Sequence, residues 1–277
     1  MKPAAEAHGF SRPHLLVSPV WLHERLGNPQ LRILDVGVLM AGLPVGYPYG
    51  HIPGAVYLDV RKFVSAVRGV PGALRPVPEL AEVIGNLGID RDMTVVIYDE
   101  GLGPIATQTF WALEFLGHRD VCILDGGIAA WKEAGLPVET DVNLPEPVAY
   151  VPTVCHDCGA TAEWIQENIE NPDVVLLDTR YPQEFSDGRI PGAVNRSWDD
   201  NLLHGKVPRL CSPPELAAAY RTLGVTPDKD IVCYCETGAR SSHTYFVLRL
   251  MGYPRVRDYD GSWTEWHRVR GLPIDHD

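Results

Sequence analysis

Gly50-His51-Ile52-Pro53-Gly54-Ala55-Val56 returns later in the chain as Gly188-Arg189-Ile190-Pro191-Gly192-Ala193-Val194. Three more segments recur in the same order and at about the same offset: 31–36 as 174–179, 94–100 as 230–236, and 124–127 as 259–262. An internal repeat of this length indicates a duplicated domain rather than a solenoid of short units. A chain of 277 residues has room for two domains of about 130 residues each.

Short apolar runs alternate with longer helical patterns inside each copy. We predict strands at 33–36, 55–58, 95–98 and 121–124, with counterparts in the second copy, and helices at 79–87, 105–116, 161–168, 214–223 and 241–251. The strand candidates are continuously apolar, which is typical of a parallel sheet buried on both faces. Each copy is therefore predicted to be an α/β domain, a mostly parallel sheet with helices on both faces. We place the domains at 12–141 and 157–277, and the proline-rich, polar stretch 140–147 as the linker.

The composition excludes several classes of partner and location. Hydrophobic residues make up 45% of the chain, but no apolar run is long enough to span a membrane. The net charge of −12 disfavours nucleic acids and anionic membranes as partners. Six cysteines are too few for a disulfide scaffold, so we expect reduced thiols and a cytoplasmic location. Two domains that bury their own cores would be stable as a monomer.

The two copies differ where a buried strand gives way to a loop. The first copy has Asp99 at this position and the second has Cys235, followed by a tight turn at Gly238 and a helix that begins near Arg240. Backbone N–H groups of such a loop, together with a helix N-terminus, can surround and stabilise an anionic sulfur. We therefore predict that Cys235 is a nucleophile rather than an inert buried thiol. Because Asp99 has no sulfur, the first copy should be catalytically silent and should form a wall of the second copy's site.

Two further stretches carry a family resemblance. One is Tyr47 followed after three residues by His51-Ile52-Pro53-Gly54-Ala55, and the other is Val256-Arg257-Asp258-Tyr259-Asp260-Gly261-Ser262-Trp263-Thr264-Glu265-Trp266. With the duplication and the single loop cysteine, they make the chain resemble the tandem-domain rhodaneses, the thiosulfate and 3-mercaptopyruvate sulfurtransferases, over nearly its whole length. The resemblance implies two tandem rhodanese-like domains, the first inactive and the second catalytic.

The resemblance also implies a mechanism and a set of site residues. Cys235 would take a sulfane sulfur from a small anionic donor, become a persulfide, and pass the sulfur to cyanide or a thiol with ping-pong kinetics. No cofactor other than this covalent persulfide is expected. The loop N–H groups would cradle the outer sulfur; they belong to Glu236, Thr237, Gly238, Ala239 and Arg240. The family also uses an arginine at the position of Arg180, whose planar guanidinium suits a sulfonate or carboxylate donor.

The loop sequence bears on the choice of donor. Mercaptopyruvate enzymes of this family favour Cys-Gly-Ser-Gly-Val-Thr, whereas a group of bacterial thiosulfate enzymes favours Cys-Arg-x-Gly-x-Arg-Ser. Gly238, Arg240 and Ser241 match the second pattern, so we favour thiosulfate over 3-mercaptopyruvate. Arg240 would act either as a donor ligand or as a loop brace paired with an acid such as Asp178. Glu236 departs from the pattern, and its charge could cost a dianionic donor on the order of 1–3 kcal/mol.

Other functions fit parts of the sequence less well. A cysteine-dependent phosphatase has five residues between its cysteine and arginine, whereas four separate Cys235 from Arg240. A binding module that carries the persulfide to a protein acceptor remains an alternative. Cys155 and Cys158 have the spacing of half a zinc site, but Cys233 and Cys235 on a buried strand could not supply the other half, and we expect no metal. Whether Cys155 and Cys158 form a redox pair or are incidental stays open, with the incidental interpretation preferred.

A second group of alternatives concerns single residues near the loop. His243 follows the loop inside the next helix, and thiolate attack on a sulfane sulfur needs no general base, so we predict a structural role for it. Trp263 is expected to pack in the core and could also wall the cleft between the domains.

Overall fold

Parallel strands form the centre of both halves of the chain. The structure is a computed structural model that describes residues 9–40, 43–44, 46–67 and 69–277. The first sheet has the order β1-β9-β8-β2-β5 and the second β11-β10-β14-β15, with every neighbouring pair parallel. The bounds are β1 (Leu16–Val17), β2 (Leu31–Gly37), β5 (Val56–Asp59), β8 (Thr94–Tyr98), β9 (Val121–Leu124), β10 (Val174–Asp178), β11 (Val194–Asn195), β14 (Asp230–Tyr234) and β15 (Val256–Asp258). The prediction of two α/β domains with parallel sheets is confirmed.

Helices cover the sheets, and local capping explains several of their ends. They are α1 (Pro19–His23), α2 (Val77–Asn86), α3 (Pro104–Phe115), α4 (Gly127–Glu133), α5 (Ala162–Asn168), α6 (Pro182–Asp187), α7 (Pro213–Thr222) and α8 (Ala239–Leu250). The Thr161 hydroxyl caps α5 by accepting from the Trp164 N–H, and Glu215 bonds the Ser212 N–H at the start of α7. The predicted strands and the five predicted helices lie within two residues of the observed ends. No helix in the described part of the chain is long and apolar enough to cross a membrane.

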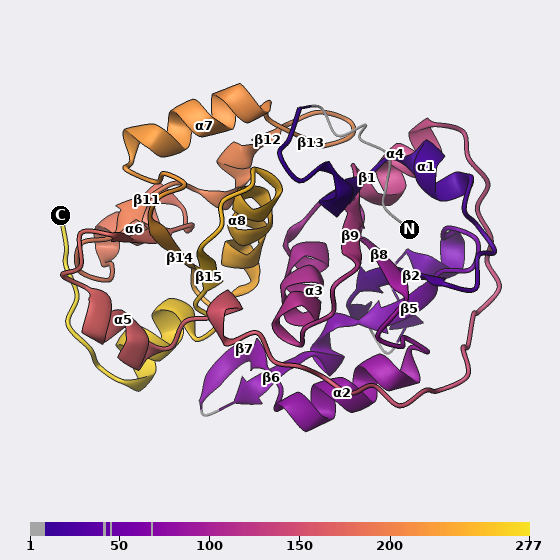
Figure 1. Cartoon of the computed structure of the whole chain (residues 1–277), viewed down its shortest axis with the longest axis horizontal. Helices are drawn as coiled ribbons and strands as arrows, with labels where there is room; N and C mark the ends of the chain where they lie inside the picture. The colour runs from indigo at the N-terminus through magenta and orange to yellow at the C-terminus, as the bar shows by residue number, and fades with distance from the viewer. Residues whose placement is uncertain (1–8, 41–42, 45, 68) are drawn as a thin grey trace.

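A buried apolar cluster spans both domains, in addition to a separate buried cluster inside each of them. Helices α3 and α8 lie side by side between the two sheets (Figure 1). Phe110 of α3 meets Phe246 of α8 edge to face, and the same buried cluster continues into both sheets. Further along the pair, Glu114 accepts hydrogen bonds from Tyr245 Oη (2.8 Å) and Arg249 Nη2 (3.0 Å). Both helices are buried on nearly every side, because each covers its own sheet and the other helix.

Each domain also extends a hairpin over the other. Strands β6 (Val64–Val67) and β7 (Val70–Leu74) of the first domain lie against the loop that follows β14. Strands β12 (Leu202–Leu203) and β13 (Arg209–Leu210) of the second domain lie against the loop that follows β8. The first hairpin also contacts the segment after β15, where Leu74 N donates to Asp260 Oδ2 at 2.8 Å. The second also contacts the segment after β9, where Arg209 Nη1 donates to the carbonyl of Asp125 at 3.2 Å. These contacts place Gly72 of the first domain beside Thr237, in the loop that holds Cys235.

Cys155 and Cys158 form a disulfide, so the expectation that all thiols are reduced and these two incidental is corrected. The pair brackets a short 3-10 turn (His156–Cys158), which holds the two Cα atoms 5.5 Å apart, within the range for a disulfide. Two hydrogen bonds fix this turn on α3: Trp111 Nε1 donates to the Cys158 carbonyl, and Cys155 N donates to the Phe115 carbonyl. Among the described residues, no group of three or more acidic, histidine or cysteine side chains could hold a metal.

His243 lies in α8, where it is enclosed by the shared core. Its ring is fully buried and meets Trp198 edge to face at 5.2 Å. Burial lowers the pKa of His243 to about 4. The imidazole is therefore neutral at physiological pH, and its structural role stays a prediction.

We predict that iodoacetamide labels four cysteines of the air-exposed protein when it is denatured without reductant, and all six after reduction. The four are Cys122, Cys211, Cys233 and Cys235, because the remaining two are bonded to each other. Intact mass after each treatment counts the labels. Six labels without reductant would show that Cys155 and Cys158 are free thiols and form no disulfide.

A second prediction concerns the pH dependence of stability. Because the folded-state pKa of His243 lies below the ordinary value of 6.5, the unfolded chain binds the proton more tightly, so stability falls as pH drops through this window. The contribution between pH 7 and pH 5 is about 2 kcal/mol. Urea unfolding of wild type and His243→Leu at both pH values should show a smaller loss for the variant. Equal losses of unfolding free energy in the two proteins would contradict the lowered pKa of His243.

Candidate active site

Cys235 sits in a short loop between β14 and α8. Its residue is 1% exposed, and its Sγ accepts a hydrogen bond from Gly238 N at 3.2 Å. The backbone of Cys235 is held on both sides, since its N–H donates to Ser262 Oγ (3.1 Å) and its carbonyl accepts from Trp263 N (3.0 Å). Helix α8 begins directly after Gly238 and directs its N-terminus towards the sulfur. The Gly238 N–H and the start of α8 therefore both face the sulfur.

Gly238 is the residue that lets the loop close on the sulfur. Its φ is +88°, in the left-handed region that favours glycine. A Cβ at this position would lie 2.9 Å from the carbonyl oxygen of Asp260 and 3.0 Å from its Oδ1, closer than real Cβ contacts. Of the N–H groups expected from the sequence to surround the sulfur, that of Gly238 makes the hydrogen bond to Sγ. The cradle expected from residues 236–240 around a persulfide stays a prediction.

Arg180 lies beside the loop, but its guanidinium is already engaged. It is 2% exposed and forms a two-pronged contact with Asp178, with Nη2 2.6 Å from Oδ2, while Nη2 also donates to the Gly188 carbonyl. Its guanidinium stacks over Trp263 at 4.5 Å. Burial alone would lower the pKa of Arg180, but the bonds to Asp178 outweigh it and raise that pKa. Arg180 is therefore a fixed cation at the edge of the site, and donor binding by it stays a prediction.

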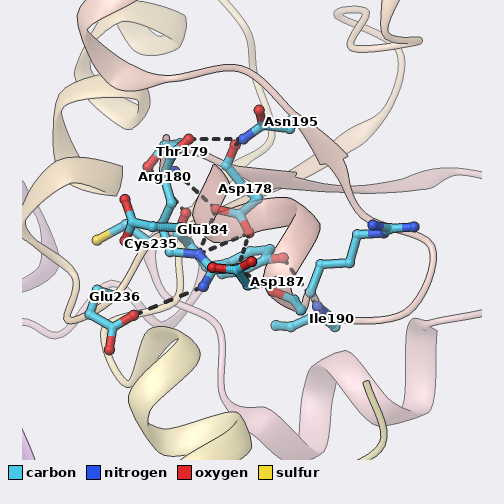
Figure 2. Close-up of polar contacts among 12 residues, drawn as sticks. Asp178, Thr179, Arg180, Glu184, Asp187, Ile190, Asn195, Cys235 and Glu236 are labelled. Atoms are coloured by element: carbon cyan, nitrogen blue, oxygen red, sulfur yellow. Dashed lines mark hydrogen bonds and ion pairs between the residues drawn. The ribbon is translucent and has the colours of Figure 1, made fainter. Parts of the chain in front are cut away.

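Arg240 braces the loop through a partner that the sequence did not indicate. Its Nη1 and Nη2 contact the two carboxylate oxygens of Glu184 in α6 at 2.6 and 2.7 Å. Asp178, the partner suggested from the sequence, is occupied by Arg180 instead (Figure 2). The bonds to Glu184 raise the pKa of Arg240, and its charge also faces the Cys235 sulfur. A permanent positive charge thus lies next to the nucleophile.

Glu236 points away from the sulfur towards two arginines. Arg268 Nη2 lies 2.7 Å from its Oε1, and Arg180 Nη1 lies 3.9 Å from its Oε2. Thr264 Oγ1 donates to the same carboxylate at 3.3 Å. These contacts offset the negative charge that the sequence placed beside the nucleophile, so the cost to a dianionic donor is reduced.

Sequence reasoning missed Ser262, Glu184 and Arg268. Ser262 adopts a left-handed φ of 51°, unusual for a residue other than glycine, and its hydroxyl both accepts from Cys235 N and donates to the Tyr259 carbonyl. The corresponding residue of the first copy is Gly127, with a φ of 58°. This difference between the copies was a usable signal. Glu184 and Arg268 had none, because their partners lie far along the chain.

The corresponding loop of the first domain is filled by its own side chain. The Asp99 carboxylate accepts hydrogen bonds from the N–H groups of Gly101 and Gly103 at 2.9 to 3.0 Å and of Ala106 at 3.3 Å. Gly37 stands at the position that corresponds to Arg180. A cavity of about 560 Å³ opens beside Asp99 and Gly37. The first domain thus keeps the cradle but holds a carboxylate in it instead of a thiol.

Comparison with known proteins agrees with this geometry. Residues 18–134 and 161–269 each match the Rhodanese-like domain family. The chain is 36% identical to the sulfur carrier protein TtuD of Thermus thermophilus over 298 aligned residues, covering 96% of this chain and 98% of that protein. It is 33% identical to a thiosulfate sulfurtransferase of Pseudomonas aeruginosa, again covering 96% and 98%.

A solved structure supports the fold. The wild-type structure of EanB matches with a TM-score of 0.85 at 24% identity, covering 95% of this chain and 69% of that one. Two matches to one domain family, together with full-length relatives above 30% identity, account for both halves of the chain. The chain belongs to the rhodanese family of sulfurtransferases and carries two rhodanese-like domains in tandem.

Proposed function

We propose that this protein is a thiosulfate sulfurtransferase that moves a sulfane sulfur to cyanide or a thiol through a persulfide on Cys235. The observation that carries the proposal is the position of the Cys235 sulfur, which accepts the Gly238 N–H and faces the Arg240 charge. Both contacts stabilise an anion on sulfur, whether it is the thiolate or the persulfide. The chain's relatives include a protein named thiosulfate sulfurtransferase.

The chemistry needs no group outside the loop and the two substrates. The Cys235 thiolate attacks the outer sulfur of thiosulfate, the S–S bond of the donor breaks, and sulfite leaves with the electron pair. The new Cys235 persulfide is then attacked at its outer sulfur by cyanide or a thiolate, and the Cys235 thiolate leaves. The products are sulfite and either thiocyanate or a new persulfide. Neither step requires a proton acceptor, which agrees with the buried, neutral His243.

The charges around the loop support thiosulfate as the donor. Arg240 offers a fixed positive charge, and the arginine partners of Glu236 offset its negative charge. Ser241 is fully buried and donates to the Gly238 carbonyl at 3.0 Å, which ties the first turn of α8 to the loop. A 3-mercaptopyruvate sulfurtransferase is the alternative, because its carboxylate donor would meet the same cation.

A second candidate function differs from the first in the molecule that accepts the sulfur. A relative that is 36% identical is named a sulfur carrier protein, so a persulfide handed on to another protein is a specific alternative to small acceptors. Both functions use the same Cys235 persulfide and differ in what removes the sulfur. We further propose a cytoplasmic monomer, without nucleic-acid or membrane partners and without a cofactor beyond the covalent persulfide. Phosphatase activity is disfavoured by the four-residue spacing from Cys235 to Arg240.

The proposal predicts that incubation with thiosulfate adds the mass of one sulfur atom to the protein and that cyanide removes it. Intact mass spectrometry measures both steps, and 3-mercaptopyruvate in place of thiosulfate ranks the donors by loading rate. Cys235→Ser should gain nothing. Cys211→Ser, which removes another free, half-buried cysteine, should load like wild type.

Loading of Cys235→Ser, or no loading of wild type by either donor, would contradict the proposal. If Cys235 kept its sulfur after treatment with cyanide but released it to a protein with a free thiol, the sulfur-carrier alternative would be favoured.

A further inference from the structure

Asp260 occupies a junction between the two domains. It follows β15 in the second domain, and its Oδ1 is buried with no hydrogen-bond partner among the described residues. Its other oxygen, Oδ2, accepts the N–H of Leu74, which is 186 residues away in the first domain. Burial raises the pKa of Asp260 to about 7, so the group is partly neutral near physiological pH.

The opposite side of Asp260 touches the sulfur-carrying loop. Its carbonyl oxygen and its Oδ1 lie 2.9 and 3.0 Å from a Cβ built on Gly238. Gly238 is the residue whose N–H donates to Cys235 Sγ. A second contact between the hairpin and the loop is made nearby, where Gly72 of β7 faces Thr237, with 3.4 Å from a Cβ built on Gly72 to the Thr237 Cβ. The hairpin therefore contacts Asp260, Asp260 contacts the loop at Gly238, and Gly238 contacts the Cys235 sulfur.

Leu74 is suited to this contact because it is the last residue of β7. It stands opposite Val64 in the hairpin, yet its N–H is directed to Asp260. This hydrogen bond thus joins the two domains and is not one of the bonds between the two strands of the hairpin.

We propose that Asp260 is a positioning residue for sulfur transfer: it ties the hairpin of the silent domain to Gly238 and thereby holds the Gly238 N–H at the Cys235 sulfur. The silent domain then contributes to the reaction by positioning the loop, and it supplies no catalytic residue. The proposal rests on the proposed function, since it concerns the reaction at Cys235. The feature it needs at position 260 is an oxygen that accepts the Leu74 N–H, and asparagine supplies such an oxygen without the charge.

The first domain offers a matched control. Asp125 stands at the corresponding position of the first copy and contacts the hairpin of the second domain, with its Oδ1 3.7 Å from Arg209 Nη1. It lies beside the loop of Asp99, which carries no sulfur. Asp125→Ala therefore removes a comparable carboxylate from a comparable domain contact away from Cys235.

Two measurements test the proposal on the full chain. Hydrogen–deuterium exchange of peptides covering 64–74 and 235–240 reports the tie directly and does not depend on any sulfur transfer. Steady-state kinetics with thiosulfate and cyanide separate kcat from KM. For Asp260→Ala we expect faster exchange in both peptides and kcat lowered about tenfold, the effect of one hydrogen bond to a charged sulfur, with KM for thiosulfate changed less than about twofold.

Asp260→Asn is expected to restore exchange and kcat to within about twofold of wild type, and Asp125→Ala to leave both peptides and kcat as in wild type. If Asp260→Ala does not fold, Leu74→Pro removes the N–H donor from the other side and should give the same faster exchange and lower kcat.

Unchanged exchange and kcat in Asp260→Ala or Leu74→Pro would overturn the proposal. It would also be overturned if Asp260→Asn were as impaired as Asp260→Ala, since the charge and not the hydrogen bond would then matter. If wild type transferred no sulfur, the proposed function would fail, while the exchange data would still decide whether the tie exists.

Discussion

The N–H of Gly238, which meets the Cys235 sulfur at 3.2 Å, is the contact on which the site depends. It exists because glycine accepts a left-handed backbone between a buried strand and a helix. The surrounding structure fixes that loop from three directions. Ser262 holds the Cys235 N–H, Glu184 holds Arg240, and the packing of α8 against α3 holds the helix that begins there. Two of these supports lie in the second domain, and the third, the packing of α8 on α3, comes from the first.

The duplicated fold places a different side chain in the same loop of each domain. Both loops direct backbone N–H groups toward the side chain that follows a buried strand. In the first domain this side chain is Asp99, whose carboxylate oxygens accept the Gly103 N–H of the loop. In the second it is Cys235, on whose sulfur we propose that the transferred sulfur atom is carried. The hairpin and α3 of the first domain contact the second domain near the Cys235 loop.

Most of the fold could be predicted from the sequence, because buried parallel strands and amphipathic helices leave local apolar patterns. The nucleophile also left a local signal, since Cys235 and Asp99 occupy equivalent positions in the repeat. What could not be predicted are contacts between distant segments: the shared core of α3 and α8, the exchanged hairpins, and the pairing of Arg240 with Glu184. The partner of Arg240 was misassigned because Asp178 was nearer in the motif, whereas competition from Arg180 is visible only in three dimensions. The disulfide was missed because the number of cysteines indicates only the redox state expected of the whole protein. It does not show that one turn brings Cys155 and Cys158 together.

The central claim is that the Cys235 sulfur, held by the loop, carries the transferred atom. A crystal structure of the protein soaked in thiosulfate, with anomalous scattering to locate sulfur, tests it most directly. The account predicts one additional sulfur bonded to Cys235 Sγ, with loop N–H groups from residues 236–240 around it, and no added sulfur near Asp99. An additional sulfur on Cys211 or another cysteine, with Cys235 unmodified in protein that transfers sulfur, would contradict it.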